Sequence, residues 1–222
     1  MKDFSSLYKD EYFVNRDQSD LKRLASFYQE KEFIEKYTST TGTVCDVGCS
    51  TGEFLSAIGW SGNKYGMEVN FSSVEKATAS GIDFSKNILT EKDFFDVVIF
   101  RGTIQHLPNP FEYISSAYDA LKSGGVIFFL ATPNANSLVY KNFNTLPALS
   151  PAYNFYIPSD ITLKNVLNNF SFEVIAVSYP YLKSPYAKPV SDHINFIIST
   201  IFKKEPKFAF WKSMMNVVAR KV

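Results

Sequence analysis

The sequence predicts an α/β fold in which helices cover both faces of a doubly wound parallel sheet. From residue 43 to residue 131, apolar runs of strand length alternate with stretches of helix length. The 222 residues, 45% of them hydrophobic, suffice for one domain with a sizeable core. All ten glycines lie between Gly42 and Gly125, whereas all ten prolines lie between Pro108 and Pro206. The two halves of the chain are therefore built differently.

The first half contains the clearest alternation of elements. Residues 17–37 carry apolar side chains at steps of three and four, which predicts an amphipathic helix. Strands are expected at residues 43–47, 64–69, 82–88, 95–100 and 126–131, of which 82–88 is the weakest. Helices are expected at residues 52–58, 72–80 and 110–121. Gly81 and Gly124 stand where glycine commonly ends a helix.

The second half has longer connections. A loop rich in Asn, Tyr and Pro is expected over residues 134–158, and a helix over 159–170. Residues 172–179 predict a strand, and 208–218 a last one. Between them lies a proline-punctuated insert, 180–206, with one helix over 192–202.

Composition excludes several classes of protein. A net charge of +1 argues against a nucleic-acid binder that relies on bulk electrostatics. The first six residues lack a signal-peptide core, and the longest apolar run, 194–202, is too short to span a bilayer. We therefore expect a soluble, cytoplasmic protein. Cys45 and Cys49 lack the further ligands that a zinc site needs, so no metal is predicted.

A glycine turn follows the first strand. Residues 46–52 read Asp-Val-Gly-Cys-Ser-Thr-Gly. Glycine at 48 and 52 permits a sharp turn and lets a ligand approach the main chain. The amide groups at the start of the following helix face such a ligand, and the carboxyl end of a strand is where open α/β sheets bind ligands. The turn therefore predicts a ligand site.

Two ligand classes use this geometry. A dinucleotide fold needs Gly-x-Gly-x-x-Gly, and two of those three glycines are missing here. Asp46, two residues before Gly48, is unsuited to a pyrophosphate and suits an ammonium group. Glu68, at the end of the second strand, can accept both hydroxyls of a ribose, a feature that both classes share.

These segments resemble the class I S-adenosylmethionine (SAM) dependent methyltransferases. The family's first motif, Asp/Glu-x-Gly-x-Gly-x-Gly, is met by 46–52 with Ser50 in place of the middle glycine. The resemblance spans about residues 42–132 and continues through Glu68, 95–98, 106–110 and 121–125. It implies a Rossmann-like, seven-stranded sheet, mostly parallel, whose last strand, 208–218, runs antiparallel beside 172–179.

The resemblance implies SAM as cofactor and S-adenosylhomocysteine as product. Asp46 would face the ammonium group, and the methionine part would be lined by Gly48, Cys49, Ser50 and Gly52. Glu68 would bind the ribose, and Val69 would flank the adenine. The adenine edge would be contacted by Asn87 and Ile88, and the residues closest to the sulfonium would be Arg101 and Gly102.

The same resemblance divides a single methyltransferase domain, 1–222, into parts. Residues 1–41 would form a helical cap or lid, with Tyr8 and Tyr12 near SAM. Residues 42–132 would bind SAM, and 133–222, with the insert 180–206, would surround the acceptor.

His106 is the candidate catalytic residue. It follows the fourth strand, near the transferred methyl group, and an oxygen acceptor needs a base for its proton. A nitrogen acceptor could need positioning only, which would make His106 an orienting group. The alternative is a histidine that packs on the Pro-Asn-Pro turn at 108–110.

The acceptor side carries a second resemblance. Residues 132–137, 156–159 and 207–215 resemble methyltransferases of bacterial surface-polysaccharide gene clusters. We therefore expect a sugar, sugar nucleotide or related small polar acceptor in glycan biosynthesis, near the loop tyrosines Tyr140, Tyr153 and Tyr156. The acceptor can be anionic, because lysines and arginines outnumber acids from residue 183 onward.

Other functions stay open at this point. A methyltransferase for a small metabolite such as a quinone precursor has the same motifs. A non-catalytic SAM-binding protein is the rival from another class, and an NAD-dependent oxidoreductase comes last. Neither a monomer nor a homodimer is excluded, and we expect no nucleic-acid partner and no membrane span.

Overall fold

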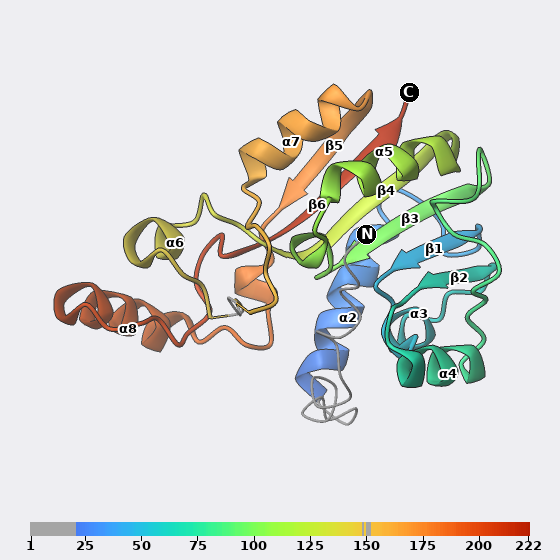
Figure 1. Cartoon of the computed structure of the whole chain (residues 1–222). Helices are drawn as coiled ribbons and strands as arrows, with labels where there is room; N and C mark the ends of the chain where they lie inside the picture. The colour runs from blue at the N-terminus through green and yellow to red at the C-terminus, as the bar shows by residue number, and fades with distance from the viewer. Residues whose placement is uncertain (1–20, 148, 150–151) are drawn as a thin grey trace.

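A computed structural model describes residues 21–147, 149 and 152–222, and its centre is a single sheet (Figure 1). The strand order is β2-β1-β3-β4-β6-β5. Their bounds are Val44–Val47 for β1, Lys64–Met67 for β2, Phe95–Arg101 for β3, Leu121–Pro133 for β4, Phe172–Ser178 for β5 and Met214–Lys221 for β6. Among these strands β6 runs antiparallel to both of its neighbours, β4 and β5, and the other neighbouring pairs are parallel. The mostly parallel sheet with an antiparallel last strand is thereby confirmed.

The expected seventh strand is absent from the described residues, so the prediction of seven strands was wrong. Within 82–88 only Asp83 forms a bridge, to Tyr65 of β2. Beyond it, side chains take over the backbone hydrogen bonds: the carboxylate of Asp83 accepts from the Ser85 amide at 2.7 Å, and the Asn87 side chain accepts from the Leu89 amide at 2.9 Å. Such Asx-type turns compete with a strand ladder.

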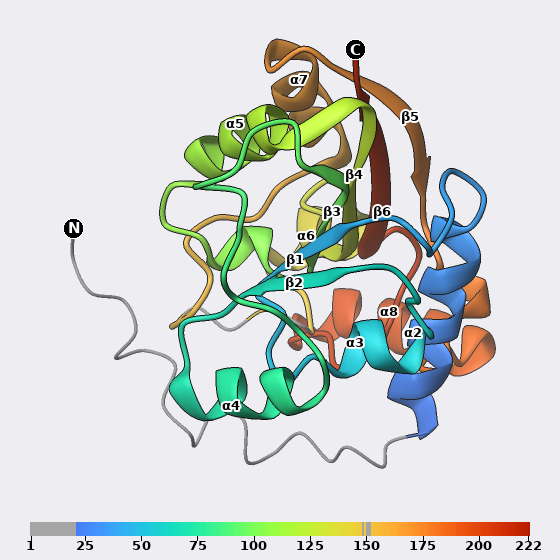
Figure 2. The ribbon, with the colours of Figure 1, turned by 90° about the vertical axis from the view of Figure 1, so that its right-hand side faces the viewer.

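Helices cover both faces of the sheet (Figure 2). One face carries α2 (Leu21–Ile34), α3 (Glu53–Ala57) and α4 (Phe71–Ala79). The other carries α5 (Pro110–Ala120) and α7 (Asp160–Asn169). The doubly wound arrangement predicted from the alternating elements is therefore correct.

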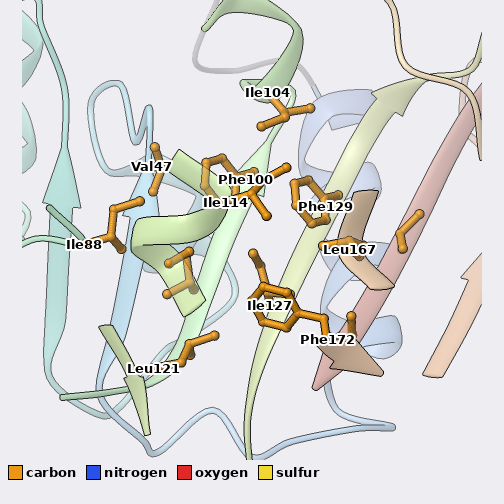
Figure 3. Packing of buried hydrophobic residues seen from close by; sticks show 14 of the residues in the cluster. Val47, Ile88, Phe100, Ile104, Ile114, Leu121, Ile127, Phe129, Leu167 and Phe172 are labelled. Carbon is orange, nitrogen blue, oxygen red and sulfur yellow. The ribbon is translucent and has the colours of Figure 1, made fainter. Parts of the chain in front are cut away.

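The core explains why the central strands read as nearly continuous apolar runs. Both faces of β3 are covered, so its alternate side chains enter different clusters: Phe100 packs toward α5, and Ile99 toward α2 and α3. Figure 3 shows the first cluster, in which Phe100 lies near Phe129 of β4. The two rings stack at 5.2 Å between centroids with planes 11° apart. Ile114 of α5 and Leu167 of α7 pack over the same face of the sheet and complete the cluster.

Two strand boundaries differ from expectation. β4 begins at Leu121, directly after α5, because Leu121 pairs with Phe95 ahead of a register shift. The last strand begins at Met214 and not at residue 208. Phe208 and Phe210 are instead buried in a separate small cluster with α6 (Leu138–Phe143), a helix inside the loop expected over 134–158.

The insert between β5 and β6 contains a short 3-10 helix, η3 (Tyr181–Lys183), and α8 (Pro189–Phe202). α8 starts three residues earlier than predicted, because Pro189 fits the first helical turn, where its missing amide hydrogen costs nothing. Within the described part of the chain, no helix is long and apolar enough to cross a membrane.

Candidate functional site

The carboxyl ends of β1, β2 and β3 meet at one edge of the sheet. Asp46 of β1 is level with Gly66 of β2 and Ile99 of β3 in the strand register. The loop after β1 is tied to β2, since the amides of Gly48 and Cys49 both donate to the Met67 carbonyl, at 2.8 and 3.1 Å. The structure thus brings the glycine turn and the end of β2 together, as the motif predicts.

The turn needs glycine for two separate reasons. Gly48 and Gly52 have φ angles of +76° and +74°, in the left-handed region that favours glycine. A Cβ atom on Gly48 would also lie 2.5 Å from Cγ2 of Thr103, and one on Gly52 would lie 2.8 Å from Cγ1 of Ile82. Ser50 adopts φ +50° without being glycine. Thr103 and Ile82 therefore pack closely against the main chain of the turn.

Glu68 joins the turn to the start of α4. Its Oε2 accepts a hydrogen bond from the Ser50 amide at 3.0 Å, and its Oε1 accepts from the amides of Val69 and Asn70 at 2.7 and 3.0 Å. The side chain of Val69 is 62% exposed beside it. A carboxylate has about four acceptor positions, so Glu68 keeps capacity for a further donor.

Asp46 is the most unusual group at this edge. Its side chain is buried, and Oδ1 has no hydrogen-bond partner among the described residues. Burial raises the pKa of Asp46 to about 7; the Arg101 guanidinium opposes the rise, and the carboxylates of Glu68 and Glu30 add to it. A buried carboxylate without a partner is costly, which predicts that a donor or cation completes this site.

Arg101 ends β3 and holds α2 against the sheet. Its Nε lies 2.5 Å from Oε2 of Glu30, and its Nη2 lies 3.2 Å from Oε1. The guanidinium also lies over the rings of Phe27 and Phe54, at 4.4 and 5.2 Å from their centroids. The sequence analysis did not identify Glu30. The one sequence feature that could have indicated it is its position as a charged residue on the side of α2 whose other residues are apolar and buried.

The other predicted cofactor residues have clear places in the fold. The backbone of Gly102 lies next to β4, where its amide donates to the Leu130 carbonyl at 2.8 Å. Ile88 is buried in the core, and Asn87 stabilises the turn described above. The thiol of Cys49 is buried, and burial raises its pKa, so the side chain serves packing. No cluster of three or more metal-ligating side chains occurs in the described ranges.

His106 closes the 3-10 helix η2 (Ile104–His106), which follows β3 directly. Its Nδ1 lies 2.7 Å from the carbonyl oxygen of Tyr153. Because a carbonyl only accepts, Nδ1 carries the hydrogen, and Nε2 is the basic nitrogen of the neutral ring. The backbone of Phe155 also pairs with Gln105 at 3.0 Å. The loop after β4 thus orients His106.

Polar side chains are buried where β4 ends. The side-chain oxygen of Asn134 accepts from the amides of Asn136 and Asp160, at 3.0 and 3.1 Å. Its Nδ2 and the hydroxyl of Ser213 are buried and have no partner among the described residues. The backbone amide of Asn134 donates to the Ser213 carbonyl at 3.0 Å, so the two residues are neighbours.

The tyrosines that the sequence analysis placed near the acceptor lie in different parts of the structure. Tyr140 and Tyr156 pack against two different apolar clusters, whereas Tyr153 supplies the carbonyl that holds His106. Tyr8 and Tyr12, predicted as part of a lid, lie outside the described residues.

The sheet order, the glycine turn and the acid after β2 define the class of α/β methyltransferases. Residues 17–177 match the family described as "Methyltransferase domain", and the chain belongs to this family. The protein is a SAM-dependent methyltransferase.

Two curated relatives show how far this likeness extends. The chain is 26% identical over 182 residues to the ubiquinone biosynthesis O-methyltransferase of Shewanella pealeana, covering 71% of this chain and 76% of the relative. It is 24% identical over 219 residues to the carboxy-S-adenosyl-L-methionine synthase of Campylobacter jejuni, covering 90% and 88%.

Solved structures share the fold. A SAM-dependent methyltransferase from Thermotoga maritima superposes with a TM-score of 0.64 at 19% identity, covering 96% of this chain and 98% of that one. The magnesium protoporphyrin IX methyltransferase of Synechocystis, solved with bound S-adenosylhomocysteine, gives 0.60 at 12% identity, covering 92% and 86%.

The close packing behind Gly48 gives a first prediction. We expect Gly48→Ala to lower stability by about 1–3 kcal/mol beyond the strain of a left-handed alanine, because the new methyl group meets Thr103. Urea unfolding measures the difference against Gly59→Ala, a matched control with φ +68° and only the flexible end of Lys31 within 4 Å. Equal losses in the two variants would contradict the packing described here.

Proposed function

We propose that this methyltransferase transfers the methyl group to a hydroxyl of a sugar, sugar nucleotide or related small polar acceptor in glycan biosynthesis. The observation that carries the proposal is the polar cluster at the carboxyl end of β4, where Asn134, Asn136 and Asp160 are joined by hydrogen bonds and the last two are partly exposed. A hydroxyl-rich acceptor would hydrogen-bond to the partly exposed members of this cluster, whereas an apolar acceptor would desolvate them without replacing their hydrogen bonds to water. The likeness of residues 132–137 and 207–215 to polysaccharide-cluster methyltransferases supports the same class.

We assign the donor site to the edge around Asp46. The unpartnered oxygen of Asp46 fits the ammonium group of SAM, and the closely packed turn at 48–52 leaves its main chain to line the methionine part. Glu68 keeps acceptor capacity for the ribose, and the exposed side chain of Val69 would flank the adenine. Asn87 and Ile88 would lie at the adenine edge, and Gly102 nearest the sulfonium.

Arg101 has a positioning role in this proposal. Its charge is directed to Glu30, so it would stabilise α2 beside the site and moderate the charge of Asp46. The sulfonium itself is a cation, and a guanidinium paired with a carboxylate repels it less than an unpaired one would.

SAM, when bound, supplies an activated methyl group for direct displacement. The protein's contribution is then mainly alignment, which can lower a barrier by about 7–11 kcal/mol. His106 would accept the acceptor's proton at Nε2, since its Nδ1 is held by Tyr153. The imidazolium that forms keeps its hydrogen bond to the carbonyl.

A quinone precursor is the second candidate acceptor. It is favoured by the relative named as a ubiquinone biosynthesis O-methyltransferase, whereas neither curated relative described above is named for a sugar acceptor. A phenolic hydroxyl needs the same base as a sugar hydroxyl, so His106 has the same role in both. The partly exposed polar cluster of Asn136 and Asp160 favours the sugar.

A panel of acceptors distinguishes the candidates. The full chain is incubated with SAM and separately with hexoses, sugar nucleotides and a catechol, and release of S-adenosylhomocysteine is measured with the mass of each acceptor. A sugar or sugar nucleotide that gains one methyl group is the expected result. Methylation of the catechol alone would replace the proposal by the second candidate. Binding of SAM without turnover on any of these acceptors would contradict both candidate acceptor classes.

The pKa of Asp46 predicts how donor binding depends on pH. An ammonium group binds the ionised carboxylate, and Asp46 ionises near pH 7. The affinity for S-adenosylhomocysteine should therefore rise about tenfold from pH 6 to pH 7.5 and then level off, since binding below pH 7 must release a proton. Isothermal titration calorimetry at several pH values measures this. An affinity independent of pH over that range would contradict the assignment of Asp46.

A further inference from the structure

The helix α8 presents its apolar side away from the protein. Exposed apolar side chains recur along it at steps of three and four residues, an arrangement that we call the α8 stripe: Val190, Ile194, Ile197, Ile198 and Ile201. Each is at least 41% exposed, and Val190 reaches 77%. At 100° per residue these positions fall within an arc of about 100°, so they form one continuous face.

The opposite face of α8 is fixed to the protein by polar and aromatic contacts. The buried carboxylate of Asp192 accepts hydrogen bonds from the Tyr181 hydroxyl and the Lys188 amide, at 2.9 and 2.7 Å. Phe196 stacks on Phe210 with centroids 4.6 Å apart and planes 5° apart. Because these contacts anchor the side away from the stripe, the stripe is a surface and not a displaced part of the core.

Exposed lysines stand at both ends of the stripe. Lys188 precedes the helix, and Lys203, Lys204 and Lys207 follow it, whereas the only exposed acid between residues 188 and 207 is Glu205. Next to the stripe, a hollow of about 620 Å³ is lined by Ile198, Lys204, Glu205 and Lys207, among others. Lys204 and Lys207 therefore line the same hollow as Ile198 of the stripe.

We propose that α8 is an interfacial anchor that inserts the α8 stripe into the surface of an anionic lipid bilayer, with Lys203, Lys204 and Lys207 contacting headgroup phosphates. An apolar face bordered by lysines is typical of helices that lie in the plane of a membrane interface. With 14 residues, α8 is too short to span a bilayer and long enough to lie in its surface.

Charge favours a membrane over a second copy of this chain. Lysines stand at both ends of α8, so two copies packed stripe to stripe would bring lysines near lysines in either a parallel or an antiparallel pair. Glu205 alone could offset them in each copy. Anionic headgroups complement the lysines, and the acyl boundary covers the apolar side chains.

The place of α8 in the fold agrees with an accessory role. It lies in the insert after residue 177, beyond the part of the chain that matches the family. Together with α6 it extends from the sheet on one side (Figure 1), and Phe143 of α6 contacts Phe196 at 6.0 Å between centroids.

Flotation of the full chain with vesicles tests the proposal. We expect binding to vesicles of phosphatidylglycerol and phosphatidylcholine to be at least about tenfold tighter than to phosphatidylcholine alone, and to weaken as salt is raised. The triple variant Ile194→Ser/Ile197→Ser/Ile201→Ser should lose binding at least about tenfold. Lys203→Gln/Lys204→Gln/Lys207→Gln should lose the preference for anionic vesicles.

The matched control carries the same kind of change elsewhere. Leu21→Ser/Phe111→Ser/Ile161→Ser removes three exposed apolar side chains from α2, α5 and α7 and should bind vesicles as the wild type does. Thermal melts show that each variant is folded. The proposal is overturned if the wild type does not float with anionic vesicles, or if control and stripe variants lose binding equally. It is also overturned if light scattering shows a dimer that the stripe variant dissociates while vesicles bind neither form.

Discussion

Asp46→Asn is expected to weaken binding of S-adenosylhomocysteine by about a hundredfold or more while leaving the fold intact. The substitution keeps the shape of the side chain and removes the charge that we assign to the ligand's ammonium group. Loss of one partner from a buried charged pair costs about 3–5 kcal/mol, and each 1.4 kcal/mol is tenfold in affinity. Isothermal titration calorimetry at pH 8 measures the change.

Stability should respond to the same variant in the opposite direction. Asp46 has a folded-state pKa raised to about 7, so the folded state binds a proton that the unfolded state has lost between about pH 4 and pH 7. Stability of the wild type therefore falls as pH rises through that window. Asp46→Asn removes this penalty and should stabilise the ligand-free protein at pH 8 by on the order of 2–4 kcal/mol.

The two readouts together exclude a trivial explanation. A variant that simply misfolds would lose binding and stability at once. The account fails if Asp46→Asn binds S-adenosylhomocysteine as the wild type does, or if its urea midpoint falls at pH 8.

His106→Asn is expected to lower kcat for an oxygen acceptor by about 10²- to 10⁴-fold, the usual contribution of general base catalysis. Asparagine was chosen because its amide can still donate to the Tyr153 carbonyl, which in the wild type holds the imidazole at 2.7 Å. The affinity for S-adenosylhomocysteine should stay unchanged, because His106 belongs to the acceptor side of our assignment. Single-turnover kinetics with the acceptor found by the panel measure the effect.

The pH profile separates a base from an orienting group. If His106 accepts the proton, kcat of the wild type rises with pH through the titration of an imidazole, and the variant loses that limb. A variant with full rate would remove His106 from the chemistry altogether. A variant that loses rate and keeps the limb would remove it from the proton transfer and leave the orienting role expected for a nitrogen acceptor.

The fold was largely predictable because its signals are local. Apolar runs such as 95–100 and glycine stops such as Gly81 lie within the elements that they define. The prediction of a seventh strand was wrong because the side chains of Asp83 and Asn87 accept hydrogen bonds from nearby backbone amides. Strand propensity carries no information about that competition. The predicted start of β6 was too early because Phe208 and Phe210 are apolar residues that pack in a separate small cluster and not in the sheet.

The site was predictable only in part. The spacing of Asp46, Gly48 and Gly52 indicates a ligand turn, and the structure gathers these residues with Glu68. The contacts of Arg101 with Glu30 and of His106 with Tyr153 join residues far apart in the chain. No local pattern encodes such pairs, and the same holds for the unpartnered groups of Asn134 and Ser213.

A crystal structure of the complex with S-adenosylhomocysteine tests the central claim most directly. The account predicts the amino group of the ligand within hydrogen-bond distance of the Asp46 carboxylate, the ribose hydroxyls at Glu68 and the adenine beside Val69. A ligand bound elsewhere, or one whose amino group lies away from Asp46, would contradict it.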